Sequence, residues 1–574
     1  MKKKSYSWNF LAFLSLSLLF IGIFISGAEA AEKVVTSGTL TYTDLHPNLN
    51  ALTWDNADWN WKHGYDTGFV VEHLLMGDLQ KGPRGSKQYS FENVGYIPPD
   101  VITGELLESW EVKKKPLMQL IFHLRKGVMW QEKPFMKARE LVADDVVYNL
   151  SRLKNSPKAI PLYLDFLGKM ETPNKYTVVI NMAEWNMDWP YLIGWGYYDG
   201  IPAPEQEKAP GGPRQWQNLT GTGPYMLTDY KEGHSQNYTR NPNYWGYETI
   251  NGQKYHLPLN DKIVMMIIKD EMTRMTLLRT GKLDLMMNLN WKYVAELKKS
   301  CPRLKWARHI GPQHFSVAMR MDRKPFNDIR VRRAMNLAIN KQEMIDSFFK
   351  GNAELHAYPF YPSFRGVYTP LEKMPPSVRE LYTYNPEKAK KLLAEAGYPN
   401  GFTFKADMAG DADQSQLDQC AIVAAYLDKV GVKMELQMTD YPSYLAKMVK
   451  KTHSEAYFLI NAPGTPIATF RKNFVTGETW NPHIMSNPYV DKTWEEVVKD
   501  PNLTEKQASE KMRNLIIYIL DQAPAISLPV PYYYTAWWPW VKNYQGEVRV
   551  GAQRSAPIMA RIWIDEELKK NMGY

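Results

Sequence analysis

The sequence predicts an α/β protein built of more than one lobe, and three observations lead to that prediction. The chain has 574 residues, whereas a single hydrophobic core rarely grows past roughly 250–300 residues. Between residues 385 and 460, helical and strand-like segments alternate four or five times, which is typical of a lobe with a largely parallel sheet. In the first half, strand-like segments are joined by long irregular, proline-bearing stretches, which favours an α+β lobe with insertions.

The best-defined element is a helix expected to begin after Tyr384. Asn385 offers a capping side chain, Pro386 suits the first turn, and Glu387 lies near the positive end of the helix dipole. Gly397 ends the helix.

The following segments continue the alternation. Residues 402–408 have strand periodicity, and the helix after them ends at Gly431. A strand at 433–438, a helical stretch at 444–451 and a short apolar run at 456–460 complete the series. The middle helix carries an apolar stripe formed by Leu417, Cys420, Ala421, Ala424 and Leu427.

Composition excludes several classes of protein. Aromatic residues make up 13% of the chain, more than a disordered chain keeps in solution. Two cysteines, Cys301 and Cys420, exclude a disulfide scaffold or a cysteine-rich metal module. We favour two free thiols over a disulfide, because Cys420 lies on the helical stripe. The formal charge of +9 is scattered, so nucleic acid is not an expected partner.

The N-terminus has the parts of a secretory signal peptide at residues 1–30. Three lysines precede an apolar stretch from about Phe10 to Ile25, and small residues follow. We predict cleavage after Ala30 and export to the periplasm; the alternative is a retained membrane anchor. No cysteine stands near the cleavage site, so a lipid anchor is not expected.

The sequence has no motif typical of catalysis or of metal or nucleotide binding. HExxH, GxSxG, the Walker A pattern and a complete GxGxxG are all missing, and the eleven histidines are dispersed. We therefore expect no catalytic residue, no metal and no cofactor. The densest aromatic cluster is Pro531–Trp540, which indicates either core packing or a ligand cleft lined by ring faces.

Five segments, in order along the chain, resemble the extracytoplasmic solute-binding proteins of ABC importers, family 5, which includes dipeptide-, oligopeptide- and nickel-binding members. In one of them a helix carries Val331, Ala334 and Ala338 on one face, and we expect its arginines (Arg330, Arg332 and Arg333) to lie mostly at the surface. The resembling segments are Phe122–Leu153, Gly221–Gly246, Lys324–Ile345, Tyr384–Phe402 and Ser486–Val497.

The resemblance implies a two-lobed periplasmic-binding-protein fold with an interlobe ligand cleft and an extra subdomain on the first lobe. It also implies capture of a small-molecule or peptide solute, delivery to ABC transporter permease subunits at the membrane, and a monomer without enzymatic activity. The expected parts are lobe I at 31–75, 215–310 and 530–574, its extra subdomain at 76–214, and lobe II at 311–529.

The resemblance also points to candidate ligand-binding residues in lobe II. Peptide-binding relatives hold the peptide's amino terminus with an aspartate, and Asn461 stands about where that acid would be. No carboxylate occurs between Ala456 and Val475. A buried ammonium without an anionic partner is costly, so a neutral or anionic solute is favoured over a free peptide amine.

Four further residues complete the predicted site. Arg471 could supply a cation and Trp480 a stacking face, although an exposed loop arginine is the alternative for Arg471. Tyr533 and Trp537 are the candidates within the aromatic cluster.

Other functions stay open from the sequence. The aromatic content suits an oligosaccharide ligand, and the positive charge suits an anionic metabolite. A secreted hydrolase and an exported chaperone-like protein that binds extended chains are the alternatives from other classes.

Overall fold

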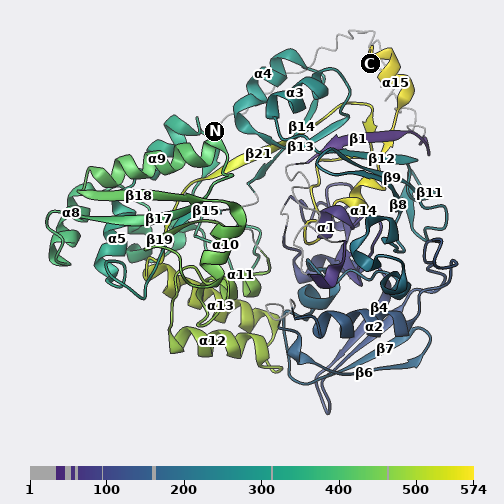
Figure 1. The fold of residues 1–574 in the computed structure, drawn as a ribbon, viewed down its shortest axis with the longest axis horizontal. Coiled ribbons are helices and arrows are strands. Elements are labelled where there is room, and N and C mark those ends of the chain that lie inside the picture. Colours follow the sequence, from purple (N-terminus) through teal and green to yellow (C-terminus); the bar gives the residue numbers. More distant parts are fainter. Residues whose placement is uncertain are drawn as a thin grey trace, which may run out of the picture.

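The computed structural model describes residues 34–44, 54–58, 63–92, 95–157, 163–311, 314–461 and 464–574. The predicted signal peptide lies outside these residues. The chain forms two α/β lobes side by side, and a smaller antiparallel sheet lies below the right-hand lobe in the view of Figure 1.

Lobe I, as we call the right-hand lobe, is built on a sheet with the strand order β14-β21-β13-β1-β12-β9-β8. Strand β1 runs parallel to both β12 and β13, whereas β21 is antiparallel to β13 and β14. The sheet therefore joins segments from the beginning, the middle and the end of the chain. The strands are β1 (Thr39–Thr43), β8 (Tyr225–Lys231), β9 (Ser235–Arg240), β12 (Lys262–Met266), β13 (Leu285–Asn290), β14 (Lys305–Ile310) and β21 (Val530–Trp537).

Lobe II contains a five-stranded sheet with the order β18-β17-β19-β15-β20. β17 is parallel to β18 and β19, as the alternating pattern predicted, whereas β15 pairs antiparallel with β19 and β20. The strands are β15 (His314–Met319), β17 (Phe402–Ala409), β18 (Val432–Thr439), β19 (Ala456–Asn461) and β20 (Ala525–Ser527).

Helices pack against the lobe II sheet and below it (Figure 1). Three of them, α11, α12 and α13, form a group at the side of the lobe that faces the subdomain. The helices of this lobe include α5 (Ile329–Leu337), α8 (Pro386–Glu395), α9 (Gln414–Asp428), α10 (Tyr441–Val449), α11 (Pro466–Phe474), α12 (Pro488–Lys499) and α13 (Glu505–Asp521).

The subdomain is an antiparallel sheet with the order β4-β5-β7-β6, in contact with helix α2 (Ala143–Lys154). Its strands are β4 (Leu107–Lys113), β5 (Gln119–Leu124), β6 (Leu167–Asn174) and β7 (Thr177–Met182).

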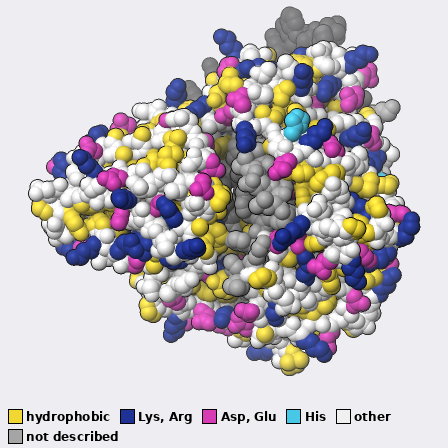
Figure 2. All heavy atoms as spheres, in the orientation of Figure 1, with side chains coloured by type: hydrophobic (Ala, Val, Ile, Leu, Met, Phe, Trp, Pro, Cys, Tyr) yellow, Lys and Arg dark blue, Asp and Glu magenta, His cyan; other side chains and the backbone are white. Residues whose placement is uncertain are grey.

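The chain crosses between the lobes twice, from β14 to β15 and from β20 to β21. Figure 2 shows the molecular surface hollowed between the two lobes, and we call this hollow the cleft. Two crossing strands leave the lobes room to rotate about a shared hinge.

Local rules account well for the helix ends. Asn385 caps α8 by accepting a hydrogen bond from the backbone of Lys388, and Gly397 takes a φ of 91° just after the helix. Cys301 and Cys420 are both buried and free, as expected. The expectation for Arg332 was wrong: the side chain is 3% exposed and donates to the carbonyl oxygens of Gln522 and Phe326.

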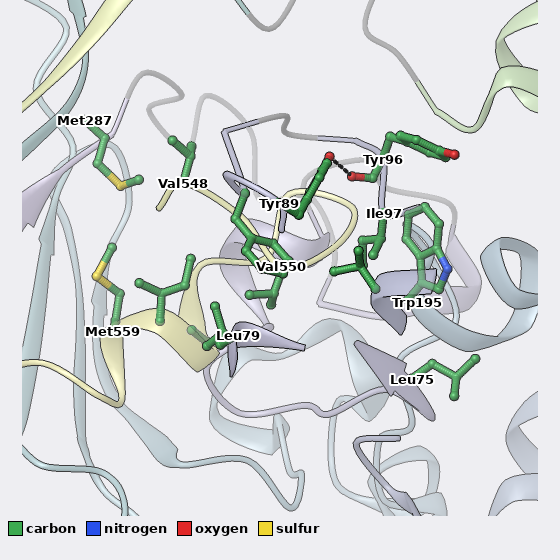
Figure 3. Packing of buried hydrophobic residues seen from close by; sticks show 14 of the residues in the cluster. Leu75, Leu79, Tyr89, Tyr96, Ile97, Trp195, Met287, Val548, Val550 and Met559 are labelled. Atoms are coloured by element: carbon green, nitrogen blue, oxygen red, sulfur yellow. Dashed lines mark hydrogen bonds between the residues drawn. The ribbon is translucent and has the colours of Figure 1, made fainter. Parts of the chain in front are cut away.

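The core of lobe I continues towards the subdomain without a break. Figure 3 shows the aliphatic side chains of Leu75 and Ile97 beside Trp195, Val550 nearer to Leu79 in the same cluster, and Tyr89 donating to the Tyr96 carbonyl oxygen at 2.8 Å. Val550, near the end of the chain, therefore helps to stabilise the region where the subdomain joins lobe I. Within the described ranges, no helix combines the length and apolarity needed to cross a membrane.

Candidate functional site

Strands β1 and β13 place the first group of polar side chains at the edge of the lobe I sheet. Asp44 follows β1 directly, and Asn288 lies near the end of the parallel neighbour β13 at a bulge in its pairing with β21. Asn288 takes a φ of 53°, which turns its side chain out of the regular strand pattern. Carboxyl ends of parallel strands are the usual ligand-binding edge of α/β sheets.

A buried ion pair organises this edge. The guanidinium of Arg549 donates to Asp44 Oδ2, and both side chains are 3% exposed or less. Asn288 Nδ2 donates to Asp44 Oδ1 at 2.6 Å, and the Arg549 Cζ lies 4.9 Å from the ring centroid of Tyr65. Because each charge has a partner, the cluster adds no net charge to the cleft.

His309 adds a neutral polar group to the same cluster. Its Nε2 lies 3.3 Å from Asn288 Oδ1. Burial, and then the nearby charge of Arg549, lower the pKa of His309 to about 4, against the opposing effect of Asp44. His309 is therefore uncharged near neutral pH.

Tyrosines form the second part of the site. Tyr197 and Tyr198, in the segment 76–214, are half-buried, and Gln553 Nε2 of lobe I donates to Tyr197 Oη at 3.3 Å. Burial raises the pKa of Tyr198, and the nearby phenols of Tyr197 and, in lobe II, Tyr441 raise it further. Tyr441 is 39% exposed and stacks on Tyr444 at 6.2 Å between centroids.

The subdomain and lobe II are in direct contact with each other. Thr465, which caps α11, donates from Oγ1 to Asp188 Oδ2 at 2.8 Å. Burial raises the pKa of Asp188 to about 7, although the Thr465 hydrogen bond and the charge of Arg471 act in the opposite direction. Lys499 and Glu184 form an ion pair of 3.1 Å across the same face.

The predicted lobe II residues lie on consecutive elements. Asn461 is the last residue of β19 and pairs with His314 of β15. Arg471 lies on α11, where its guanidinium carbon is 4.2 Å from the Tyr163 ring centroid and its Nε is 3.5 Å from Glu478 Oε1. Arg471 therefore faces the subdomain, so it is not an exposed loop arginine.

The remaining predicted residues are divided between the two lobes. Trp480 packs against the small cluster of lobe II that contains Tyr444 and Tyr457. Tyr533 pairs with His309 across β21 and β14, next to the lobe I polar cluster. Trp537 is 4% exposed and packs edge-on against Tyr544 at 4.9 Å. Four residues of strand place Trp537 about 13 Å along β21 from Tyr533.

Sequence reasoning did not single out Asp44, Asn288, Arg549 or Asp188. Asp44 carried a usable signal, because it directly follows Thr39–Thr43, a segment with the alternation of a strand. Asp44 and Arg549 are 505 positions apart, and no local pattern predicts such a pair. In the described part of the chain, no group of three His, Cys, Asp or Glu side chains is arranged to hold a metal ion.

Comparison with known proteins shows which family the chain resembles. A sequence model of a family described as bacterial extracellular solute-binding proteins, family 5 (middle), matches residues 101–482. The heme-binding protein A of Haemophilus influenzae is 30% identical over 315 residues, which is 52% of this chain and 54% of that protein. The dipeptide-binding protein of Escherichia coli is 26% identical over 380 residues, which is 62% of this chain and 66% of that protein. The chain thus spans between half and two thirds of these curated relatives.

A solved structure extends the likeness in fold. The periplasmic binding protein DppA from Helicobacter pylori, in complex with the peptide STSA, superposes with a TM-score of 0.72 at 20% identity. The match covers 92% of this chain and 99% of that one.

Proposed function

The chain belongs to family 5 of the bacterial extracellular solute-binding proteins, and on that basis we propose that it captures a peptide-like or other small organic solute between its lobes. Delivery of the solute to the permease of an ABC importer completes the proposed function. The observation that supports it most is the buried Asp44–Arg549 cluster at the carboxyl edge of β1 and β13, the edge at which α/β sheets usually bind ligands.

The geometry suits capture by closure. Each lobe is built on its own sheet, and the cleft lies between the two lobes (Figure 2). Closure of two lobes around a solute removes it from water and gives the permease a surface that differs from the open form. This function needs no covalent step.

The proposal includes the location and assembly expected from the sequence. We propose export to the periplasm with cleavage after Ala30, a monomeric protein, and the lobe boundaries given above. The relatives named above are described as binding different molecules, so the shared fold leaves the solute to be decided by the site.

An oligosaccharide is the second candidate ligand. Tyr197, Tyr198 and Tyr441 present ring faces and phenols on both sides of the cleft, which is the chemistry that stacks on sugar rings and bonds their hydroxyls.

The test is native mass spectrometry of the protein produced with its own leader and purified from the periplasm without refolding. We expect one small adduct for each chain and an intact mass that begins at residue 31. A sample unfolded in urea and refolded is the control and should lose the adduct. Turnover of a chromogenic glycoside without a stable adduct would support the hydrolase instead, and weak binding of many unfolded segments would support the chaperone-like protein.

A further inference from the structure

A polar cavity lies outside the cleft, where the subdomain segment meets lobe I. Its volume is about 200 Å³, whereas one water needs roughly 10–15 Å³ of such space, so the cavity can hold a small molecule. Its walls include parts of β2 (Leu75–Gly77), β3 (Ile102–Gly104) and β10 (Tyr247–Ile250), and none of the described residues that line it belongs to lobe II. β10 pairs with β11 (Gln253–His256), which Figure 1 shows on the side of lobe I turned away from lobe II.

Arg125 brings a positive charge to this cavity. Its guanidinium carbon lies 4.6 Å from the ring centroid of Trp245. Nε donates to the Glu105 carbonyl oxygen at 2.6 Å, and Nη2 donates to the Gly104 carbonyl oxygen at 3.2 Å. These carbonyl oxygens orient the guanidinium without neutralising it, and Nη1 makes no hydrogen bond within the described part of the chain.

The acids beneath Arg125 do not supply the missing negative charge. Both oxygens of Glu105 accept hydrogen bonds of 2.7 Å from the guanidinium of Arg554. Glu72 accepts from the indole nitrogen of Trp245 at 3.0 Å. Burial, and then the charge of Glu105, raise the pKa of Glu72 to about 8, so Glu72 is mostly protonated at neutral pH. Arg125 therefore keeps its charge without a carboxylate beside it.

Arg561 contributes a second guanidinium to the same cavity. Its Nε donates to Glu248 Oε2 at 2.5 Å, and its Nη1 donates to the Pro557 carbonyl oxygen at 2.7 Å. No hydrogen bond between described residues uses its Nη2. Each of the two arginines thus has one terminal nitrogen left to donate.

The remaining charges at the cavity leave a small positive excess. Asp78 is the one acid among the described lining residues, and its Oδ1 accepts from the backbone nitrogen of Gln80 at 3.0 Å. Lys254 lies beside the wall, with its Nζ 4.1 Å from the ring centroid of Tyr247. Tyr247 is 51% exposed, so this side of the cavity is open to solvent. Together with the two arginines and the Glu248 partner of one of them, three cations stand against two acids.

We propose that this cavity is a second binding site and that it takes a small organic anion, whose carboxylate or phosphate group accepts hydrogen bonds from Arg125 and Arg561. Guanidinium groups bind such oxyanions through paired N–H donors. The ring faces of Trp245 and Tyr247 contact the carbon part of the anion. The site goes beyond the proposed function, because it shares no residue with the cleft.

The experiment uses the full periplasmic protein and four probes in a buffer of low ionic strength without phosphate. Benzoate and phenyl phosphate distinguish a carboxylate from a phosphate ester, inorganic phosphate lacks the carbon part, and benzylamine carries the opposite charge. Titration calorimetry gives the affinities. The variants are Arg125→Gln and Asp78→Asn, which keeps the oxygen that accepts from Gln80. The control is Arg303→Gln, an exposed arginine of lobe I that also donates to a carbonyl oxygen.

We expect benzoate or phenyl phosphate to bind at one site for each chain, and more tightly than inorganic phosphate or benzylamine. Arg125→Gln should lower that affinity by about 10–100-fold, the usual range for a hydrogen bond to a charged group. Asp78→Asn should raise it by about 2–5-fold, because it removes a like charge at a partly exposed position. Arg303→Gln should stay within twofold, and the solute that copurifies in the cleft should be retained by all three variants.

Four results would overturn the second site. They are no binding of either organic anion to the wild type, tighter binding of benzylamine, equal affinities for phenyl phosphate and inorganic phosphate with none for benzoate, and an unchanged anion affinity in Arg125→Gln. If Arg125→Gln does not fold, as judged by circular dichroism, Asp78→Asn decides: a rise in affinity supports the site, and any other result contradicts it. A wild type without a copurified solute bears on the proposed function alone.

Discussion

Asp44 and Asp188 are buried acids on two different walls of the molecule, and they differ in what neutralises them. Asp44, at the edge of the lobe I sheet, receives the guanidinium of Arg549 and the amide of Asn288. Asp188, at the contact between the subdomain and lobe II, receives one hydroxyl hydrogen bond from Thr465. The first acid is therefore part of a buried ion pair, whereas the second has no ion-pair partner among the described residues.

Breaking the Asp44–Arg549 ion pair should have the largest effect on stability. Arg549→Met removes the cation and leaves Asp44 buried, which should lower the free energy of unfolding by about 3–5 kcal/mol. Urea unfolding at pH 7 measures this change. The double variant Asp44→Asn/Arg549→Met should lose much less than the sum of the two single changes. If Arg549→Met lowers the free energy of unfolding by less than 1 kcal/mol, the ion pair does not matter for the stability of Asp44, and the contrast between Asp44 and Asp188 fails.

Removal of the Asp188 carboxylate should change the free energy of unfolding in the opposite direction. The pKa of Asp188 is raised to about 7 in the folded protein, so the folded chain binds more protons than the unfolded chain between about pH 4 and 7. The stability of the wild type therefore falls as pH rises through this range. Asp188→Asn should be near neutral at pH 4.5 and stabilise the ligand-free protein by roughly 2–4 kcal/mol at pH 8.

Unfolding of wild type and Asp188→Asn at three pH values tests this difference. Part of the slope should survive in the variant, because burial and the Glu105 carboxylate raise the pKa of Glu72 to about 8. If Asp188→Asn were destabilised at pH 8, the Asp188 carboxylate would stabilise the folded protein, as the Asp44 carboxylate is expected to do.

The aromatic wall of lobe II should matter for binding more than for stability. Tyr441 is 39% exposed, so Tyr441→Ala should lower the free energy of unfolding by about 1 kcal/mol or less. Its loss should weaken binding of the copurified solute by about 3–10-fold, because the solute loses a ring face. Tyr489→Ala is the matched control: Tyr489 is 52% exposed on α12 and should leave affinity unchanged. Equal effects of the two variants would remove Tyr441 from the site.

The smallest expected effect belongs to His309. With its pKa lowered to about 4, chiefly by burial, its ring should not change protonation between pH 5.5 and 8. NMR of the ring protons, assigned with His309→Gln, should show constant shifts over that range. A midpoint near 6.5 would mean that the lobe I cluster is open to water and not a buried scaffold.

Local sequence rules predicted the elements whose ends and faces are encoded by neighbouring residues. The α8 helix begins at its Asn385 cap and is followed by Gly397, and β17, α9 and β18 follow in the predicted order. The same rules failed for Arg332, because the carbonyl oxygens that hold it inside come from Gln522 and Phe326. A helical stripe shows which face is apolar but does not show which charged residue finds buried acceptors.

The sequence by itself determined the α/β class, the parallel strands β17, β18 and β19 of lobe II and the resemblance to a family, because these depend on short-range periodicity and on motifs in register. It also determined that no carboxylate occurs between Ala456 and Val475. Only the tertiary structure decided that Arg549 lies on Asp44, and that Asp188 of the subdomain meets Thr465 at the end of lobe II. These contacts join residues 505 and 277 positions apart, and chain folding alone brings such partners together.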